Sequence, residues 1–580
     1  MHPLVQDAVY QDVSAGERAL RHERAARILQ DRAAPAERVA GHLLLAPTRG
    51  DPGTVRTLRV AALAAAGRGA SDSAVTFLRR ALDEPPDARE RIDVLVDLGR
   101  FESMVDGSAA VAHLTEAHGS LTDPAERAEL ALVIARTLAF VGRRGSATGF
   151  AAAAADAVPA EYEDARQGLQ ALVRVTGYMH ALPPEGYRPG PDPAIVGDGD
   201  GARMLAAVRA FEITLQGVDR AGAVELARFA LSDDRLLDAD HMLVWILAVN
   251  VLLLADADVE QLWRHARRHA RVAGSLFAML AVNTWQGYAQ WRRGRLDEAA
   301  QSFADATEQM PAWGGLEVAG SYVAAFSAGV HLDRGDIDAA ARVVRDGRTL
   351  PRIGDGARIM RLSTARLYLA QGRPEAALAA LAADVGHFDI ANAAWDHWRD
   401  PAARALAALG RIDEALATAD EHLELLRRWG APSALGAGLL LAGELRGAAG
   451  IPLLREAVEV LAPADAALVL ARARLALGRR PEVDRDEAVR LLRAAVDAAR
   501  DRGSPVLREQ ALAALADRGE TAEDFAAEQD GRPMTAREQQ VLDLTASGLD
   551  LHQVAQRLFL TPTAVHAVLM SASAKARAGG

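Results

Sequence analysis

The chain has 580 residues and a formal net charge of −12; half of its residues are apolar, only 5% are aromatic, and none is cysteine. The absence of cysteine excludes disulfides, thiolate nucleophiles and cysteine metal sites, and it suits a cytoplasmic protein. Because attraction to phosphate needs a cationic surface, a chain this acidic is not a general nucleic-acid binder, and any contact with DNA must come from a small region of different charge.

The apolar residues are mostly alanine and leucine. Both favour helix, whereas the β-branched and aromatic residues that favour strands are sparse. We therefore predict an all-α protein, and its length suggests several domain-sized units.

Residues 1–181 are predicted to form an N-terminal helical domain, because Arg18 to Gln30 and Asp72 to Leu82 carry apolar residues at helical spacing. Residues 182–201, with five prolines and five glycines, are predicted to be a linker. The end of this linker begins like a calcium loop, but Arg209 stands where such a loop requires glutamate.

The longest apolar run extends from Met242 to Ala255 and contains Asn250. It is shorter than the roughly 20 residues of a membrane-spanning helix, so it predicts a buried core helix and no membrane partner. Further on, His265 and His269 have the spacing of metal ligands on one helix face, but neighbouring arginines oppose a cation. We favour a solvated basic face there, and we predict no metal and no other cofactor.

One motif recurs within residues 202–518: a glycine, two variable residues, an acidic residue and, two positions later, an alanine. Its glycines are Gly294, Gly335, Gly372 and Gly410, with a weaker copy at Gly478. Glycine can take the left-handed conformation that ends a helix, and the acidic residue suits the start of the next one. The pattern is similar to tetratricopeptide repeats, with slightly longer periods, and predicts a tetratricopeptide-like helical-hairpin superhelix.

Five aromatic or histidine side chains in this region invite two interpretations: Trp285, Trp291, Trp395, His397 and Trp398. Aromatic residues at helical spacing more often belong to a core, which is the favoured interpretation. The alternative is that they line a ligand pocket within the repeats.

A second linker is predicted at 519–533, before a C-terminal segment of three short helices at 534–580. Thr535 and Glu538 match a capping box, Gly548 ends the first helix, and Leu551 to Phe559 makes the second. Thr561-Pro562 starts the third. A helix, a tight turn and a further helix form the helix-turn-helix plan.

This segment resembles the LuxR-type DNA-binding domain. The matching positions are Thr535, Arg537, Glu538, Val541, Leu542, Gly548, Ala555, Leu558, Val565 and Leu569. Several of these are core positions, so they bear on the fold rather than on contact with DNA. The family's last helix has no evident counterpart before the sequence ends at Gly580.

The resemblance implies DNA contacts on the third helix. His566, Ala567 and Met570 occupy positions where the family touches bases, and Thr561, Thr563 and Lys575 would contact phosphates. The family usually has a lysine where this chain has His566, and five Lys/Arg against three Asp/Glu leave residues 532–580 only slightly positive. DNA binding is therefore expected to be weak or conditional, with a shallow salt dependence.

The start of the chain is similar to another segment of the same family. His2-Pro3-Leu4, Ala8 and Tyr10 resemble a stretch that, in large LuxR-type regulators, follows an ATPase module and leads into helical repeats. The phosphate loop of such a module needs a lysine, and the only lysine here is Lys575. The sequence is thus identified as a LuxR-type regulator of the ATPase-plus-helical-repeat class that lacks the ATPase module, while a module encoded upstream stays open.

These features predict a DNA-binding transcriptional regulator whose helical repeats sense a protein or small-molecule signal. The alternative is a helical-repeat scaffold for protein–protein interaction, with a degenerate helix-turn-helix that does not bind DNA. Neither a nucleophile elbow nor a paired-histidine metalloprotease motif occurs, so no enzymatic activity is expected. Homo-oligomerisation stays open.

Overall fold

The computed structural model describes residues 10, 12–84, 86–142, 145–183, 192–238, 241–314, 317–520, 536–558, 565–566, 568–570 and 572. The chain divides into two units, one of residues 1–470 with 502–504 and one of residues 471–501 with 505–580. Every regular element in the described parts is a helix, which confirms the all-α prediction. Within the same ranges, no helix is both long and apolar enough to cross a membrane.

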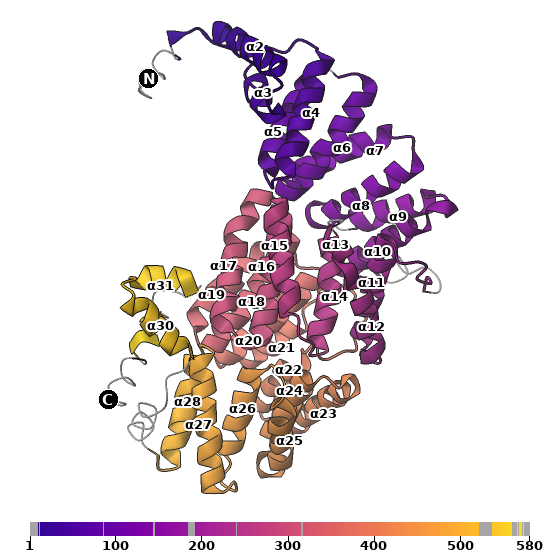
Figure 1. The fold of residues 1–580 in the computed structure, drawn as a ribbon. Coiled ribbons are helices and arrows are strands. Elements are labelled where there is room, and N and C mark those ends of the chain that lie inside the picture. Colours follow the sequence, from indigo (N-terminus) through magenta and orange to yellow (C-terminus); the bar gives the residue numbers. More distant parts are fainter. Residues whose placement is uncertain are drawn as a thin grey trace. The chain divides into compact units, whose positions relative to one another are not determined.

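The first unit begins with a run of helices joined by short turns. These are α2 (Ala15–Asp31), α3 (Ala36–Leu43), α4 (Pro52–Ala66), α5 (Ser71–Asp83), α6 (Ala88–Val105), α7 (Gly107–Ser120), α8 (Pro124–Val141), α9 (Ser146–Ala157) and α10 (Glu163–Met179). Each helix packs against the next along the chain, as Figure 1 shows for α4 to α7. The predicted helices at Arg18 to Gln30 and Asp72 to Leu82 correspond to α2 and α5.

The same unit continues with a second run of helices, which are again arranged as hairpin pairs that follow one another along the chain. They are α11 (Asp200–Gln216), α12 (Arg220–Leu231), α13 (Arg235–Asp238), α14 (Met242–Leu254), α15 (Glu260–Ala273), α16 (Leu276–Arg292), α17 (Leu296–Trp313), α18 (Glu317–Arg334), α19 (Ile337–Asp346), α20 (Asp355–Ala370), α21 (Pro374–Leu381), α22 (Arg399–Ala408), α23 (Ile412–Trp429), α24 (Pro432–Leu445) and α25 (Ile451–Leu461). Short 3₁₀ turns occur at Ala160–Tyr162, Ser232–Asp234, Gly347–Thr349 and Gly447–Gly450.

The recurring glycines end helices as the sequence predicts. Gly294, Gly335, Gly372 and Gly410 all have φ between 68° and 86°, in the left-handed region. The next helix begins two residues later in each case, with aspartate or glutamate in its first turn. The prediction of stacked, tetratricopeptide-like helical hairpins is confirmed.

Helix α14 explains how the middle of the first unit is filled. All of its residues from Met242 to Leu254 are buried, because the helix is apolar around its whole circumference and has no polar face to offer to water. The prediction of a buried core helix here is confirmed. The helix also carries Asn250 into the interior, where the side chain is fully buried.

The second unit consists of most of α26 (Ala467–Gly478), with α27 (Arg485–Asp501), α28 (Pro505–Asp517), α30 (Ala536–Ala546) and α31 (Leu551–Leu558). The weak motif copy at Gly478 departs from the others, because α27 begins only at Arg485. There Asp484 accepts hydrogen bonds from the backbone amides of Asp486 and Glu487. The domain boundaries proposed at residues 182–201 and 519–533 stay predictions.

The C-terminal segment has a small apolar core of its own. Val541, Val554, Ala555 and Val565 are buried together. Gly548 has a φ of 90° in the turn between α30 and α31, where the sequence places the end of the first helix. Its cap at Thr535 and the start of the third helix at Thr561-Pro562 lie outside the described residues.

A candidate ligand pocket among the central helices

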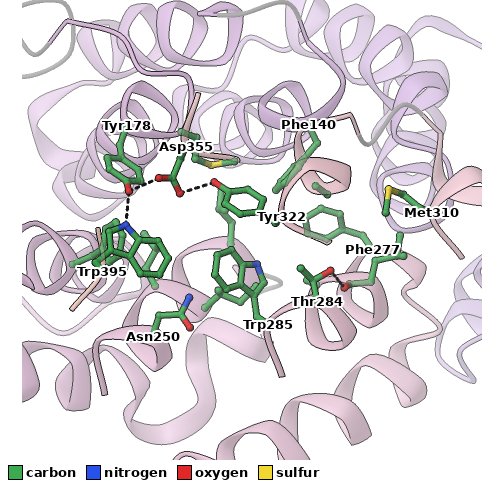
Figure 2. A pocket seen from close by; sticks show the side chains of 18 residues that line it. Phe140, Tyr178, Asn250, Phe277, Thr284, Trp285, Met310, Tyr322, Asp355 and Trp395 are labelled. Atoms are coloured by element: carbon green, nitrogen blue, oxygen red, sulfur yellow. Dashed lines mark hydrogen bonds between the residues drawn. The ribbon is translucent and has the colours of Figure 1, made fainter. Parts of the chain in front are cut away.

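An apolar pocket lies in the first unit, around the buried helix α14. Side chains from α8, α10, α11, α16, α17, α18 and α20 complete its walls, together with Trp395 from the segment between α21 and α22. Figure 2 shows these side chains converging on one space and labels the polar and aromatic ones discussed below. The pocket has an empty volume of about 800 Å³ with its open mouth included, and the centres of water-sized molecules can occupy about 60 Å³ of it.

Seven of the eighteen residues that line the pocket are aromatic. The rings of Trp285 and Trp395 are nearly parallel, with their centroids 6.4 Å apart. Tyr322 lies 5.1 Å from Trp285, and Phe140 lies 5.1 Å from Phe277 in an edge-to-face arrangement. Such walls offer large apolar contact at little cost in side-chain entropy, which suits the binding of a small organic molecule.

The segment that carries Trp395 is irregular, but it is held firmly by hydrogen bonds to α11. The backbone amides of Ala391 and Asn392 both donate to the carbonyl of Leu215, and the Asn392 side chain donates to the carbonyl of Thr214 at 2.7 Å. The Asn392 Oδ1 in turn accepts from the amide of Ala394 at 2.9 Å. Trp395 is thereby positioned by contacts far away in the sequence.

A buried carboxylate organises the polar edge of the pocket. Asp355, the first residue of α20, accepts hydrogen bonds from the hydroxyls of Tyr178 at 2.7 Å and Tyr322 at 3.0 Å. The Tyr178 oxygen itself accepts a hydrogen bond from the indole N–H of Trp395 at 2.7 Å, as Figure 2 shows. Burial and the nearby Asp355 charge raise the pKa of both tyrosine hydroxyls well above the ordinary value, so both stay protonated and act as donors.

The charge of Asp355 is compensated within the interior. Arg358, which is fully buried, donates from Nε to Asp355 at 2.8 Å and pairs with Asp396 at 2.9 Å. Arg361 lies 3.5 Å from the other oxygen of Asp396. Two carboxylates thus face two guanidinium groups, so this side of the pocket carries no net formal charge.

Asn250 differs from the other polar side chains of the pocket. Tyr178, Thr284, Tyr322 and Asp355 all make hydrogen bonds within the protein. Neither the amide nitrogen nor the amide oxygen of Asn250 has a protein partner, although both atoms are buried. An unpaired buried polar group costs about 1–3 kcal/mol, so the burial of this amide without a partner is unfavourable.

The sequence-based pocket hypothesis is met by two of its five residues. Trp285 and Trp395 line the pocket, whereas Trp291, His397 and Trp398 are not among the side chains on its wall. Trp291 instead donates its indole N–H to Asp333 at 2.7 Å. The interpretation of these aromatics as core fits Trp395, which is buried and also lines the pocket, whereas Trp285 and Trp291 are only half-buried.

Of the histidines considered as metal ligands, His265 is 3.4 Å from Asp234, and His269 is 3.8 Å from Asp238. Of the DNA-contact candidates, His566 and Met570 are exposed. Thr561, Thr563, Ala567 and Lys575 lie outside the described residues. Contact of these six residues with DNA stays a prediction.

Sequence reasoning missed Tyr178, Asp355 and the role of Asn250. One signal was available, since Asn250 is the single polar residue in the run from Met242 to Ala255. A polar residue in the middle of an otherwise apolar buried helix needs a partner or a function.

Two further histidines give the first unit a pH-dependent stability. Burial lowers the pKa of His422 to about 4, and it lowers that of His397 to about 4 as well. The unfolded state, with a pKa near 6.5, takes up a proton before the folded state does, so stability is lost as the pH falls below about 6.5. Between pH 6.5 and 5, His422 alone should cost about 2 kcal/mol.

We expect His422→Leu to remove this part of the pH dependence in urea unfolding at pH 7, 6 and 5. His265→Leu, at a half-buried position on α15, is the control and should leave the pH dependence as in the wild type. An unchanged pH profile in His422→Leu would show that the folded protein does not keep His422 neutral as the pH falls from 7 to 5.

No protein-family model matches the sequence, and no curated protein matches it. Among solved structures, the chain is similar to the crystal structure of the APC/C hetero-tetramer Cut9-Hcn1, with 12% identity over 90% of this chain and 99% of that chain and a TM-score of 0.37. It is also similar to the crystal structure of Scc4 in complex with Scc2n, with 9% identity over 82% of this chain and 96% of that chain and a TM-score of 0.39.

Proposed function

We propose that this chain is a recognition protein that acts by binding: it takes up a small, mainly apolar molecule in the pocket around α14 and presents its helical hairpins to a protein partner. The pocket carries the first part of the proposal. It combines aromatic walls, a compensated polar network and a buried amide without a partner, which are features of sites for small organic molecules.

Titration with toluene tests whether the pocket accepts a ligand. Toluene should bind to the wild type, measured by calorimetry or by the change in tryptophan fluorescence, and Ala281→Leu should weaken binding about tenfold or more. Ala281 lines the pocket, so the added methyl groups would occupy the space that the ligand needs.

Ala64→Leu is the matched control, because Ala64 is exposed on α4 and remote from the pocket wall. It should bind toluene like the wild type. Equal binding by Ala281→Leu and the wild type would place the ligand elsewhere and contradict the proposal.

The helical hairpins support the second part of the proposal, a protein-interaction scaffold. Hairpins stacked one after another expose a succession of outer helix faces, and extended surfaces of this kind are what helical-repeat proteins use to hold partners. In this account the chain has no catalytic role, and ligand occupancy of the pocket adjusts the hairpins that a partner contacts.

A second candidate function, transcriptional regulation through the C-terminal segment, is favoured by one observation. The buried cluster of Val541, Val554, Ala555 and Val565 joins α30, α31 and the helical residues that follow, as a LuxR-type helix-turn-helix would require. His566 and Met570 are then on the outside, where a recognition helix would meet bases.

A mobility-shift measurement at low salt on the native promoter region tests this candidate. We expect a weak shift that His566→Ala combined with Met570→Ala abolishes, since these two side chains would face the major groove. Gln539→Ala, on the exposed face of the first helix of the segment, serves as the control and should shift DNA normally. If no shift is seen even with a bound partner, the DNA-binding candidate fails and the scaffold function is the one that stands.

A further inference from the structure

We propose that the pocket recognises a compact, uncharged carboxamide, with Asn250 as the specificity-determining residue. This inference rests on the proposed ligand-binding function and names the chemical class that the site would take. It stands on the one amide in the pocket whose donor and acceptor are both unused.

The position of Asn250 supports a ligand partner rather than an internal one. The residue lies in the last part of α14 and is fully buried. In Figure 2 its amide faces the part of the pocket that Trp285 and Trp395 line. Those flanking walls are aromatic, so they leave the amide to a molecule that enters the cavity.

The geometry of an amide dictates which group pairs with it best. Asparagine has two N–H donors and one carbonyl acceptor, and one of the two N–H groups lies beside the oxygen. A primary carboxamide or a lactam offers the complementary acceptor and donor at the same spacing, so two hydrogen bonds close a ring. A ketone satisfies only the donor, and a carboxylate lacks the proton that the Asn250 oxygen needs.

The electrostatics of the pocket favour an uncharged ligand. Asp355 is already held by Tyr178, Tyr322 and Arg358, so its charge is not available to attract a cation. An ionised ligand would lose its hydration without gaining an opposite charge, which is unfavourable in an apolar site.

The space and the walls limit the ligand to about one ring. The centres of water-sized molecules can occupy only about 60 Å³ of the pocket. Met179 and Met310 border it, and methionine side chains adapt their shape more readily than branched or aromatic ones. A single aromatic ring can thus be admitted by small adjustments of these two side chains.

Calorimetric titration of the full-length chain with benzamide, acetophenone and toluene tests the inference. Benzamide and acetophenone differ only in an NH₂ group against a methyl group, so their comparison isolates the second hydrogen bond. Wild type should bind benzamide more tightly than acetophenone, and Asn250→Leu should weaken benzamide binding about tenfold while toluene binding is kept. The comparison of the two ligands needs no variant, so it decides the matter even if Asn250→Leu does not fold.

The other possible results distinguish failure of the carboxamide inference from failure of the proposed ligand-binding function. Toluene binding that Ala281→Leu weakens, together with benzamide binding that Asn250→Leu leaves unchanged, would overturn the carboxamide inference alone. Acetophenone binding as tight as benzamide binding would do the same. If none of the three ligands binds to the wild type, the proposed ligand-binding function fails as well.

Discussion

Asp355→Ala should lower the free energy of unfolding by about 3–5 kcal/mol. The carboxylate accepts hydrogen bonds from Tyr178, Tyr322 and Arg358, and all four residues are buried. Removing it would leave two hydroxyls without acceptors. It would also leave the fully buried Arg358 guanidinium with only one of its two carboxylate partners, Asp396.

Urea unfolding followed by tryptophan fluorescence measures this loss. Asp420→Ala is the matched control, because Asp420 pairs with Arg446 at an exposed position and such pairs contribute at most about 1 kcal/mol. A loss of less than about 1 kcal/mol for Asp355→Ala as well would mean that water reaches the network and that this edge of the pocket is not a dry interior.

Trp395→Ala should be almost as damaging and should also change what the pocket can hold. Truncation of a buried tryptophan costs about 3–5 kcal/mol. Trp395 is 4% exposed, donates to Tyr178, and lies over the Arg358 guanidinium at 5.4 Å. Because it lines the pocket, its removal would join a new cavity to the existing one.

Added indole should therefore restore part of the stability of Trp395→Ala by filling the enlarged cavity. Thermal unfolding with and without indole measures this, and the wild type, whose pocket lacks the space left by the Trp395 side chain, should be stabilised much less. Equal stabilisation of the wild type and the variant by indole would contradict the assignment of Trp395 to the pocket wall.

Much of the fold is predictable because it is encoded locally. Each of these hairpins can be predicted from a glycine that ends one helix and an acidic residue in the first turn of the next, only a few positions apart. The same logic could have found hairpins in the N-terminal part. Gly69, Asp72 and Ala74 repeat the motif between α4 and α5, and Gly69 has a φ of 76°.

The pocket could be predicted only in part, because it depends on long-range contacts. Tyr178 meets Asp355 across 177 positions of sequence and Trp395 across 217. Helical periodicity carries no information on such encounters, so it flagged Trp285 and Trp395 as part of an aromatic set without separating them from Trp291. The hydrogen-bond network around Asp355 could not be predicted for the same reason, because none of its residues belongs to a recognisable sequence motif.

For the C-terminal segment, three of the positions that match the LuxR-type domain, Val541, Ala555 and Val565, are buried together in the structure. Core positions follow from hydrophobic periodicity. Affinity for DNA depends instead on charges and side chains at the surface, and of those candidates only His566 and Met570 lie among the described residues.

A crystal structure of the chain soaked with bromobenzene is the most direct test of the central claim, that the cavity around α14 is a ligand site. Bromobenzene has nearly the shape of toluene, and the anomalous signal of bromine locates it independently of the model. The account predicts one bromine peak inside the walls formed by Trp285, Trp395 and Phe277, and no such peak in Ala281→Leu. A wild-type pocket filled by its own side chains, with bromine bound only at the surface, would contradict it.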